Sequence, residues 1–313
     1  MNIDGVLVTW GDRLFYPSNR IVKGGPPPKL SGEALRRRAD AIRSRIEATV
    51  VRRSPQVMVK VTGGGRGMRA IAAHFRYISK NGRLDIEDDR GETIRGARAV
   101  RDLSEDWRFS GSLITEEADG AGRREAFNIM LSMPRGTDPL AVHRAARAFA
   151  RVELADNKCV MVLHDHQANP HVHISVRVES RHGRRLNPRR ADLHRWRETF
   201  AEKLREQGIE AEASRQAVRG RSGRSEALWR IKAQQDDRLR SRANPSSDSA
   251  RSAGRQAAAV AEWERIGHAL AKSPNGRDQR LSTAVHRFVT NVFKMPDVDN
   301  ARNLAKSVTV ERW

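Results

Sequence analysis

The residues best suited to chemistry lie in one short stretch, where four of the ten histidines fall between positions 164 and 173. His171 and His173 are separated by one residue and lead into alternating apolar residues, a pattern that predicts a strand with both imidazoles on one face. His164 precedes the turn signal Asn169-Pro170, so we expect it on the neighbouring strand of a hairpin. Neutral imidazole binds divalent metals, and three protein ligands leave positions open for a substrate oxygen. The pattern therefore predicts a catalytic metal site at His164, His171 and His173, with His166 either sharing that face or solvated.

A tyrosine is the candidate nucleophile, and the chain has only two, Tyr16 and Tyr77. Residues 68–80 are predicted to form a helix whose buried stripe leaves Tyr77 on its flank. His74 and Lys80 stand three residues before and three after it, on the same side. We expect such cationic neighbours to ease ionisation of the phenol. Taken alone, Tyr77 is better explained as a boundary residue that packs its ring on the core.

The charge of the chain favours a polyanionic partner. Its 313 residues carry 59 Lys and Arg against 38 Asp and Glu, a net charge of +21. Residues 35–76 hold eleven basic side chains against two acids, and residues 181–255 hold twenty against ten. Most are arginines, which suit bidentate contacts to phosphate. The alternative is an Arg-rich composition without a specific partner.

The cysteine and hydropathy patterns indicate where the protein works. Cys159 is the only cysteine, so no disulfide can form within the chain, as is usual in a reducing cytosol. No apolar run approaches the roughly 20 residues of a membrane span, and the N-terminus lacks the apolar segment of a signal peptide. We expect a soluble, cytoplasmic protein with no membrane span.

The core is predicted to be an α+β fold. Strands are expected at 57–61, 127–133, 159–163 and up to about 178, and helices at 68–80, 95–107, 140–154 and 193–207. The acidic stretch 85–92 reads as a loop or hairpin. Because hairpin and crossover connections are mixed, we expect a sheet with helices on one face and the other face open for a site.

Two further regions flank this core. Residues 1–56 are predicted to be a basic N-terminal extension with a helix at 32–51, either a DNA-contacting arm or a solvated helix. Residues 226–313 read as a basic linker followed by a helical C-terminal region, with helices at 256–272 and 279–294. The expected domains are thus 1–56, 57–225 and 226–313.

Three motifs in this order resemble those of plasmid mobilisation relaxases, in the superfamily of His-hydrophobe-His endonucleases. The segment 59–65 followed by 74–85 looks like their nucleophile motif, 127–139 like their second motif, and 164–176 like their metal motif. Residues 211–220 resemble the segment after their last core helix. The most similar members that we identify are the border-nicking relaxases of Ti plasmids.

The resemblance implies a palm-like antiparallel sheet of about five strands and a complete chemistry. Mg²⁺ or Mn²⁺ held by the three histidines would assist attack of Tyr77 on a DNA phosphate, which gives a 5′-phosphotyrosine. The substrate would be single-stranded DNA at a transfer origin, with an accessory origin-binding protein and a coupling protein as partners. Trp196 and Trp229 could stack bases, although Trp196 is better explained as a core residue. The candidate DNA-binding residues are Arg66, Lys80, Arg181, Arg184 and Arg185.

The sequence departs from this family at two positions. His166 stands where the family usually has an acid, and Asp165 lies one residue earlier. Asn169 stands where the family often has a histidine. The general base that takes the proton of Tyr77 is therefore either Asp165 or His166.

Other classes fit less well. A histidine-triad nucleotide hydrolase would need a histidine where Ser175 stands, and it would not explain the charge. In rolling-circle replication initiators and single-strand transposases the tyrosine normally follows the histidines, whereas Tyr77 precedes His164 by 87 residues. A non-catalytic DNA-binding accessory protein or decayed relaxase is the third alternative, motivated by His166.

Overall fold

The computed structural model describes residues 2–16, 30–117, 123–220 and 245–294, without side chains for 245–252. The chain forms two compact units, one of residues Ser54–Ala213 and one that combines Met1–Arg53 with Ser214–Trp313. We call them the sheet unit and the helical unit. No helix in the described ranges is long and apolar enough to cross a membrane.

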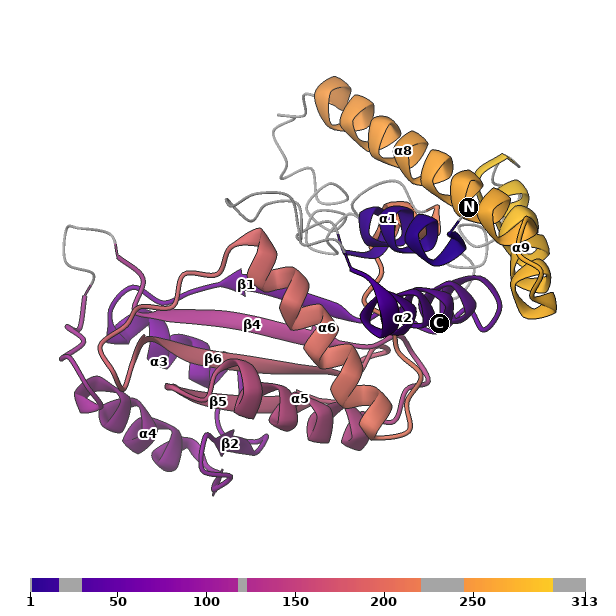
Figure 1. The fold of residues 1–313 in the computed structure, drawn as a ribbon. Coiled ribbons are helices and arrows are strands. Elements are labelled where there is room, and N and C mark those ends of the chain that lie inside the picture. The colour runs from indigo at the N-terminus through magenta and orange to yellow at the C-terminus, as the bar shows by residue number, and fades with distance from the viewer. Residues whose placement is uncertain (1, 17–29, 118–122, 221–244, 295–313) are drawn as a thin grey trace. The chain divides into compact units, whose positions relative to one another are not determined.

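The sheet unit is built on six antiparallel strands in the order β1-β4-β6-β5-β2-β3 (Figure 1). Strand β5 places apolar side chains on both faces of the sheet, whereas β6 turns its apolar residues to one face and its histidines to the other. β2 and β3 form a short hairpin that begins in the stretch 85–92, predicted to be a loop or hairpin, and ends just after it. The bounds are β1 (Met58–Gly63), β2 (Ile86–Asp88), β3 (Thr93–Ile94), β4 (Ala126–Ser132), β5 (Asn157–His164) and β6 (His171–Ser180).

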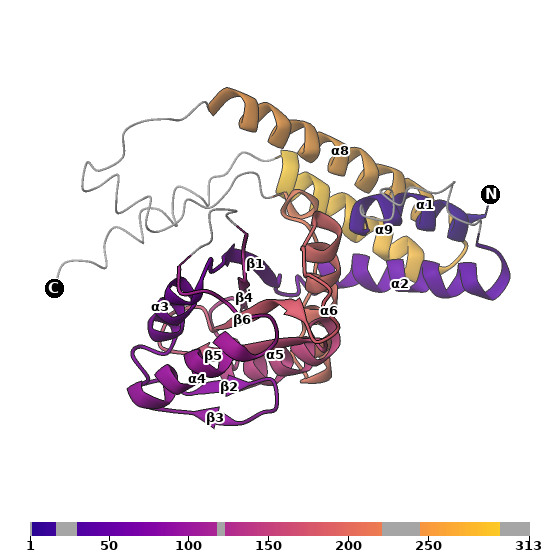
Figure 2. The same ribbon diagram turned by 90° about the vertical axis from the view of Figure 1, so that its left-hand side faces the viewer.

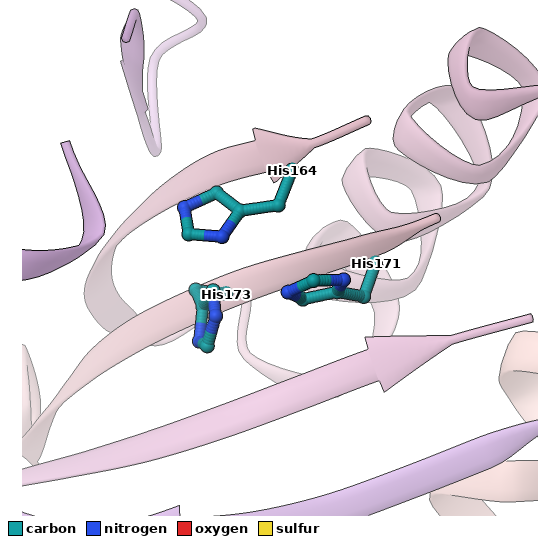
Figure 3. A group of neighbouring side chains, drawn as sticks. All are labelled: His164, His171 and His173. Carbon is teal, nitrogen blue, oxygen red and sulfur yellow. The ribbon is translucent and has the colours of Figure 1, made fainter. Parts of the chain in front are cut away.

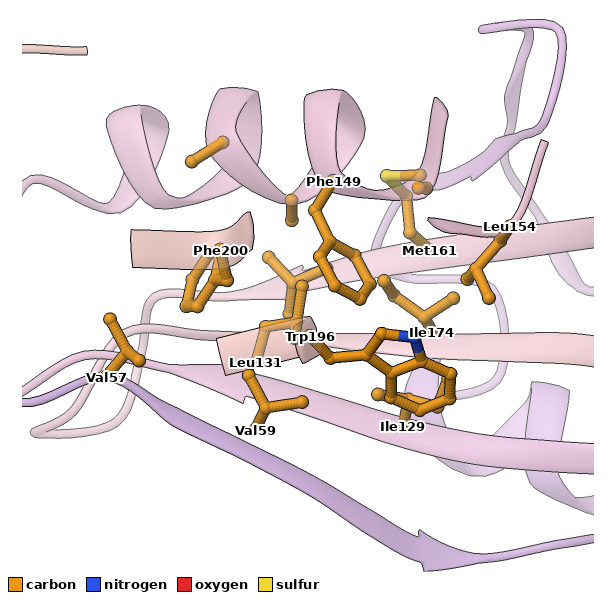
Figure 4. Close-up of a cluster of buried hydrophobic side chains, with 14 of the residues drawn as sticks. Val57, Val59, Ile129, Leu131, Phe149, Leu154, Met161, Ile174, Trp196 and Phe200 are labelled. Carbon is orange, nitrogen blue, oxygen red and sulfur yellow. The ribbon is translucent and has the colours of Figure 1, made fainter. Parts of the chain in front are cut away.

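Helices α5 (Pro139–Glu153) and α6 (Arg190–Glu206) pack on one face of the sheet and enclose its main core (Figure 4). Trp196 of α6 is buried, and its ring meets that of Phe149 edge to face, with centroids 6.1 Å apart. The role of Trp196 as a core residue is confirmed. Because aromatic side chains bury large apolar areas, this cluster fixes the two helices on the sheet.

The other face carries helices α3 (Met68–Ile78) and α4 (Ala97–Phe109) (Figure 2). On β5, Val160 and Val162 turn toward these helices, whereas Cys159 and Met161 turn toward α5 and α6. The α+β class is confirmed, but the sheet has six strands, and helices cover parts of both faces rather than one. The physical reason is that β5 is apolar on both sides, so both sides of the sheet need cover there.

The helical unit brings together segments from both ends of the chain. It contains α1 (Ile3–Phe15), α2 (Gly32–Val50), the short η2 (Gln216–Arg219), α8 (Pro245–Ala271), α9 (Gly276–Val289) and the π-helical turn η3 (Thr290–Lys294). Their shared core includes Leu14, Ile46, Trp263 and Val285. A Cβ at Gly11 would lie 2.4 Å from Ile42 of α2, so glycine allows the close approach of α1 to α2.

The sequence analysis predicted α2, α8 and α9 but not α1. It also treated the N-terminal and C-terminal segments as separate regions, divided at 56/57 and 225/226. In the structure the units divide after Arg53 and after Ala213, and the two terminal segments share one core. Such a long-range association leaves no local sequence pattern.

Candidate active site

Three histidines converge at one end of the central hairpin (Figure 3). His164 ends β5, His171 begins β6, and the two stand directly opposite in the register of the strands. His173 faces the same side, opposite Val162. One ligand nitrogen from each ring lies within 4.8 Å of the others. This is the hairpin arrangement that the spacing predicted.

The hydrogen bonds of the rings orient them for a metal. His164 Nε2 donates to the backbone carbonyl of Ile78 at 2.7 Å, and His171 Nδ1 donates to the carbonyl of Asn169 at 2.9 Å. Because a carbonyl only accepts, these nitrogens carry the protons, which leaves His164 Nδ1 and His171 Nε2 with free lone pairs. The Nδ1 atoms of His164 and His173 are buried without a hydrogen-bond partner among the described residues. Metal-binding histidines typically donate their other N–H to a carbonyl in this way, so the donor set fits a divalent metal.

Burial favours the neutral form of two of the imidazoles, those of His164 and His173. It lowers the pKa of His173 to about 3, with further lowering from His164, His171 and His74. Burial also lowers the pKa of His164, although the hydrogen bond to the Ile78 carbonyl acts to raise it. Since only neutral imidazole offers a lone pair, these groups are ready to bind a metal at neutral pH.

Tyr77 lies in the last turn of α3, the helix that supplies the Ile78 carbonyl. Its side chain is 71% exposed, so the phenol is accessible from solvent. The ring of His74 stacks beside it, with centroids 6.2 Å apart, and lies 6.4 Å from the ring of His173. Burial lowers the pKa of His74 to about 4. His74 is therefore neutral, and the expectation that it places a positive charge beside Tyr77 is wrong.

The turn after α3 fixes this end of the helix. Lys80, Asn81 and Gly82 all have positive φ, at 50°, 59° and 82°. The buried Ser79 Oγ donates to the carbonyl of Phe75 and accepts from Gly82 N–H. A Cβ at Gly82 would lie 2.4 Å from a backbone atom of the next segment, so only glycine fits there. This packing holds the Ile78 carbonyl against His164.

The turn that follows β4 is tied to the histidine hairpin. Asn169 Oδ1 accepts from the backbone N–H of Arg135 at 3.0 Å, and the carbonyl of Pro170 accepts from Met133 N–H at 3.1 Å. Asp138 then caps α5 by accepting from two backbone N–H groups. Asn169, which departs from the family pattern, thus connects His171 to the second motif.

The remaining candidate residues lie in different places. Asp165 and His166 are exposed in the turn between β5 and β6, and the His166 ring lies 5.1 Å from that of His164. Arg66 is exposed in the glycine turn before α3, and Lys80 follows Tyr77. Trp229 lies outside the described residues. Arg181, Arg184 and Arg185 follow β6 at the end opposite the histidines.

Sequence reasoning missed two contributors to the site. The Ile78 carbonyl is a backbone group, so no residue type announces it. Asn169 was noted only as a departure, whereas its contacts with His171 and Arg135 show what it does. The Asn-Pro turn signal was the one hint available.

The fold and the site together define a class: an α+β nuclease-like domain with a His-hydrophobe-His metal set beside an exposed tyrosine. Residues 77–209 match the family model of the MobA/VirD2-like relaxase nuclease domain. The chain therefore carries a relaxase nuclease domain, and the resemblance to plasmid mobilisation relaxases is confirmed. Such a domain is a DNA endonuclease that binds single-stranded DNA. The match covers less than half of the chain and does not test the narrower likeness to Ti-plasmid enzymes. No curated protein matches the chain.

Proposed function

We propose that this protein is a relaxase that nicks one DNA strand at a transfer origin and rejoins it, for conjugative plasmid mobilisation. The observation that carries the proposal is the meeting of three histidine nitrogens within 4.8 Å beside the helix of the exposed Tyr77. The match that begins at Tyr77 supports it. We further propose a bacterial, cytoplasmic location, with an accessory origin-binding protein and a coupling protein as partners.

Tyr77 is the proposed nucleophile. Its Oη attacks the scissile phosphorus, a tyrosine O–P bond forms, and the bond to the 3′ oxygen breaks. The products are a 5′-phosphotyrosine and a free 3′-hydroxyl. Because the phosphodiester energy is kept in the covalent link, the 3′-hydroxyl can reverse the step, which hydrolysis by water would prevent.

His164, His171 and His173 are the proposed holders of Mg²⁺ or Mn²⁺. A bound divalent ion would offset the negative charge that builds on the phosphate oxygens during attack. The carbonyls of Ile78 and Asn169 keep the rings turned toward that position.

The proton of Tyr77 needs an acceptor, and Asp165 and His166 are the proposed alternatives. Both are exposed in the turn beside His164. Comparing Asp165→Asn with His166→Gln separates them, since the general base is the residue whose loss slows nicking by about 10²-fold or more. The other variant should keep nearly full activity.

The DNA strand is proposed to reach this site over basic residues. Arg66 and Lys80 flank α3 at its two ends, and Arg181, Arg184 and Arg185 follow β6. Single-stranded DNA binding of this kind depends on contacts to the backbone phosphates.

Nicking of supercoiled DNA is the deciding experiment. The DNA carries the region that flanks the protein's own gene, the reaction contains Mg²⁺ or Mn²⁺, and it ends with SDS and protease. We expect a nicked circle with protein on the 5′ end, absent with Tyr77→Phe and with His171→Ala. His182→Ala is the matched control, because His182 is an exposed histidine beyond β6.

Other outcomes point elsewhere. Nicking that survives Tyr77→Phe would mean hydrolysis or another tyrosine, with Tyr16 the remaining candidate. Tight binding to single strands without any nicking would support a non-catalytic accessory protein. Nicking confined to a replication origin would support a replication initiator.

A further inference from the structure

The sheet unit has an open polar cavity of about 370 Å³ away from the histidines. This volume lies within the range of small-molecule sites. Its walls combine hydrogen-bond donors and acceptors. Among the lining residues are Gly67, Ser112, Arg123, Glu125, Glu179 and Arg185.

One wall of the cavity is held rigid. Glu179 accepts from the Ser112 N–H at 3.0 Å and from the Ser112 hydroxyl at 2.6 Å. Beside it, the buried Arg177 donates to the carbonyls of Trp107 and Ser112. These bonds fix the segment that begins at Ser112, so the wall is already formed without a ligand.

Next to this wall the cavity has charged side chains, since Arg185 pairs with Glu179 in a backbone bridge. Arg185 forms an ion pair with Glu125 at 3.3 Å and is about one-third exposed. Arg123 is exposed and makes no ion pair with any described residue. A ligand in the cavity can therefore contact a guanidinium donor and a carboxylate acceptor side by side.

The cavity lies on the same face of the sheet as the histidines. His173 and Glu179 are on the same face of β6, six residues apart, which at 3.3 Å per residue is about 20 Å. Gly67 of the cavity precedes α3, and Tyr77 lies near the other end of that helix. A strand with its phosphate at the histidines would have a base a few nucleotides away at the cavity.

We propose that this cavity reads one base of the single-stranded substrate, and that the base is guanine. Arginine is the usual partner of guanine O6 and N7, and a carboxylate accepts from its N1–H and N2–H₂. Arg185 and Arg123 supply the first contact and Glu125 the second. The proposal rests on the proposed function, because it assumes a single-stranded DNA substrate.

The test is a binding selection that needs no cleavage. Full-length Tyr77→Phe protein selects from a pool of random single-stranded DNA, and the same is done with Arg185→Ala, Glu125→Gln or Arg144→Ala added. Arg144 lies on α5, is 49% exposed, pairs with Asp138 and is not a cavity residue, so it is the matched control. Glu125→Gln removes a negative charge, so general affinity for DNA is retained.

We expect a guanine preference of about 5- to 150-fold at one position, as single base contacts give. The preference should disappear with Arg185→Ala, weaken with Glu125→Gln and persist with Arg144→Ala. A preference that persists in both cavity variants would overturn the proposal, as would the absence of any guanine preference. Nicking by the Tyr77 protein is measured separately, so the relaxase proposal can stand when this one fails.

Discussion

The two units have similar lengths but differ in charge. The sheet unit has 28 basic and 23 acidic side chains, a net charge of +5, whereas the rest of the chain has 31 and 15, a net charge of +16. All three candidate metal ligands belong to the sheet unit. The chemistry and the excess positive charge are therefore carried by different parts of the chain.

Both units contain arginines that are paired with acids and arginines that are exposed. In the sheet unit, Arg147 of α5 makes a bidentate pair with the buried Glu87 of β2. In the helical unit, Arg43 pairs with Asp278. The exposed arginines of the helical unit that make no ion pair with any described residue include Arg36, Arg280 and Arg287. Unpaired exposed cations are free to meet phosphates.

The largest expected effect is on the chemistry of the sheet unit alone. His173→Ala removes one of three metal ligands, so nicking should fall by about 10²-fold or more. Affinity for single-stranded DNA should change by less than about twofold, since the basic residues remain. A nicking assay and a titration with single-stranded DNA measure the two effects, and calorimetry of Mn²⁺ binding checks that the ligand is lost. An equal loss of DNA affinity would show that chemistry and binding are not separable.

Replacing one core tryptophan in each unit should destabilise only the unit that contains it. Trp263 is fully buried between Phe15 and Phe288, and its Nε1 donates to the Val218 carbonyl at 2.9 Å. Trp263→Ala should cost about 3–5 kcal/mol of unfolding free energy in the helical unit. Hydrogen exchange should then rise in α1, α2, α8 and α9 while β4 to β6 stay protected.

Trp196→Ala should instead destabilise the sheet unit, because Trp196 packs in the core of that unit. Exchange should rise in β4 to β6, and Mn²⁺ binding should weaken. If either substitution raised hydrogen exchange throughout both units, the two units would unfold cooperatively as one.

We expect the helical unit to lose stability in acid, because the carboxylate of the buried Asp278 is held in its ionised form. Burial alone would raise the pKa of Asp278, but hydrogen bonds from Arg43 and Ser273 hold it below its ordinary value of 3.8. A depressed folded pKa gives stability that is present above about pH 4 and lost as the pH falls through the folded pKa.

Asp278→Asn should therefore lower stability at pH 7 and flatten its loss between pH 5 and about 2. Urea unfolding at both ends of that range measures this. An unchanged pH dependence would assign the acid sensitivity to other carboxylates. Arg37 pairs with Glu33 on the surface of α2, so Arg37→Gln is a suitable control.

The smallest expected effect is on the salt dependence of single-stranded DNA binding. Replacing the three unpaired arginines of the helical unit by glutamine should reduce the salt dependence of single-stranded DNA binding by up to about 2 in the log–log slope, about 0.7 per lost phosphate contact. The matched triple in the sheet unit should change the slope less, because its arginines pair with acids. That control replaces Arg69, Arg144 and Arg195.

Much of the sheet unit could be predicted from the sequence. The alternation after His171 and the Asn-Pro turn predicted the hairpin, and the apolar stripe of residues 68–80 predicted the helix that places Tyr77. These succeeded because strand and helix periods are local properties. The helices on both faces were not predicted, since an apolar strand does not tell what covers it.

Long-range features had no such signal. α1 contains Gly5, Gly11 and several β-branched residues, so its helix propensity is weak, and packing against α2 and α8 decides its structure. The neutral state of His74 depends on its burial, which residue type alone does not give. The cavity at Arg185 is lined by segments that are distant in the chain.

The sequence by itself determined the ligand types, their spacing on two strands and the order in which the tyrosine precedes them, because these depend on residue identity and local period. Only the tertiary structure decided which nitrogens of His164 and His171 are free, since the carbonyls of Ile78 and Asn169 hold the others. It also decided that the two ends of the chain share a core. Both depend on contacts between residues far apart in sequence, and such contacts are set by packing.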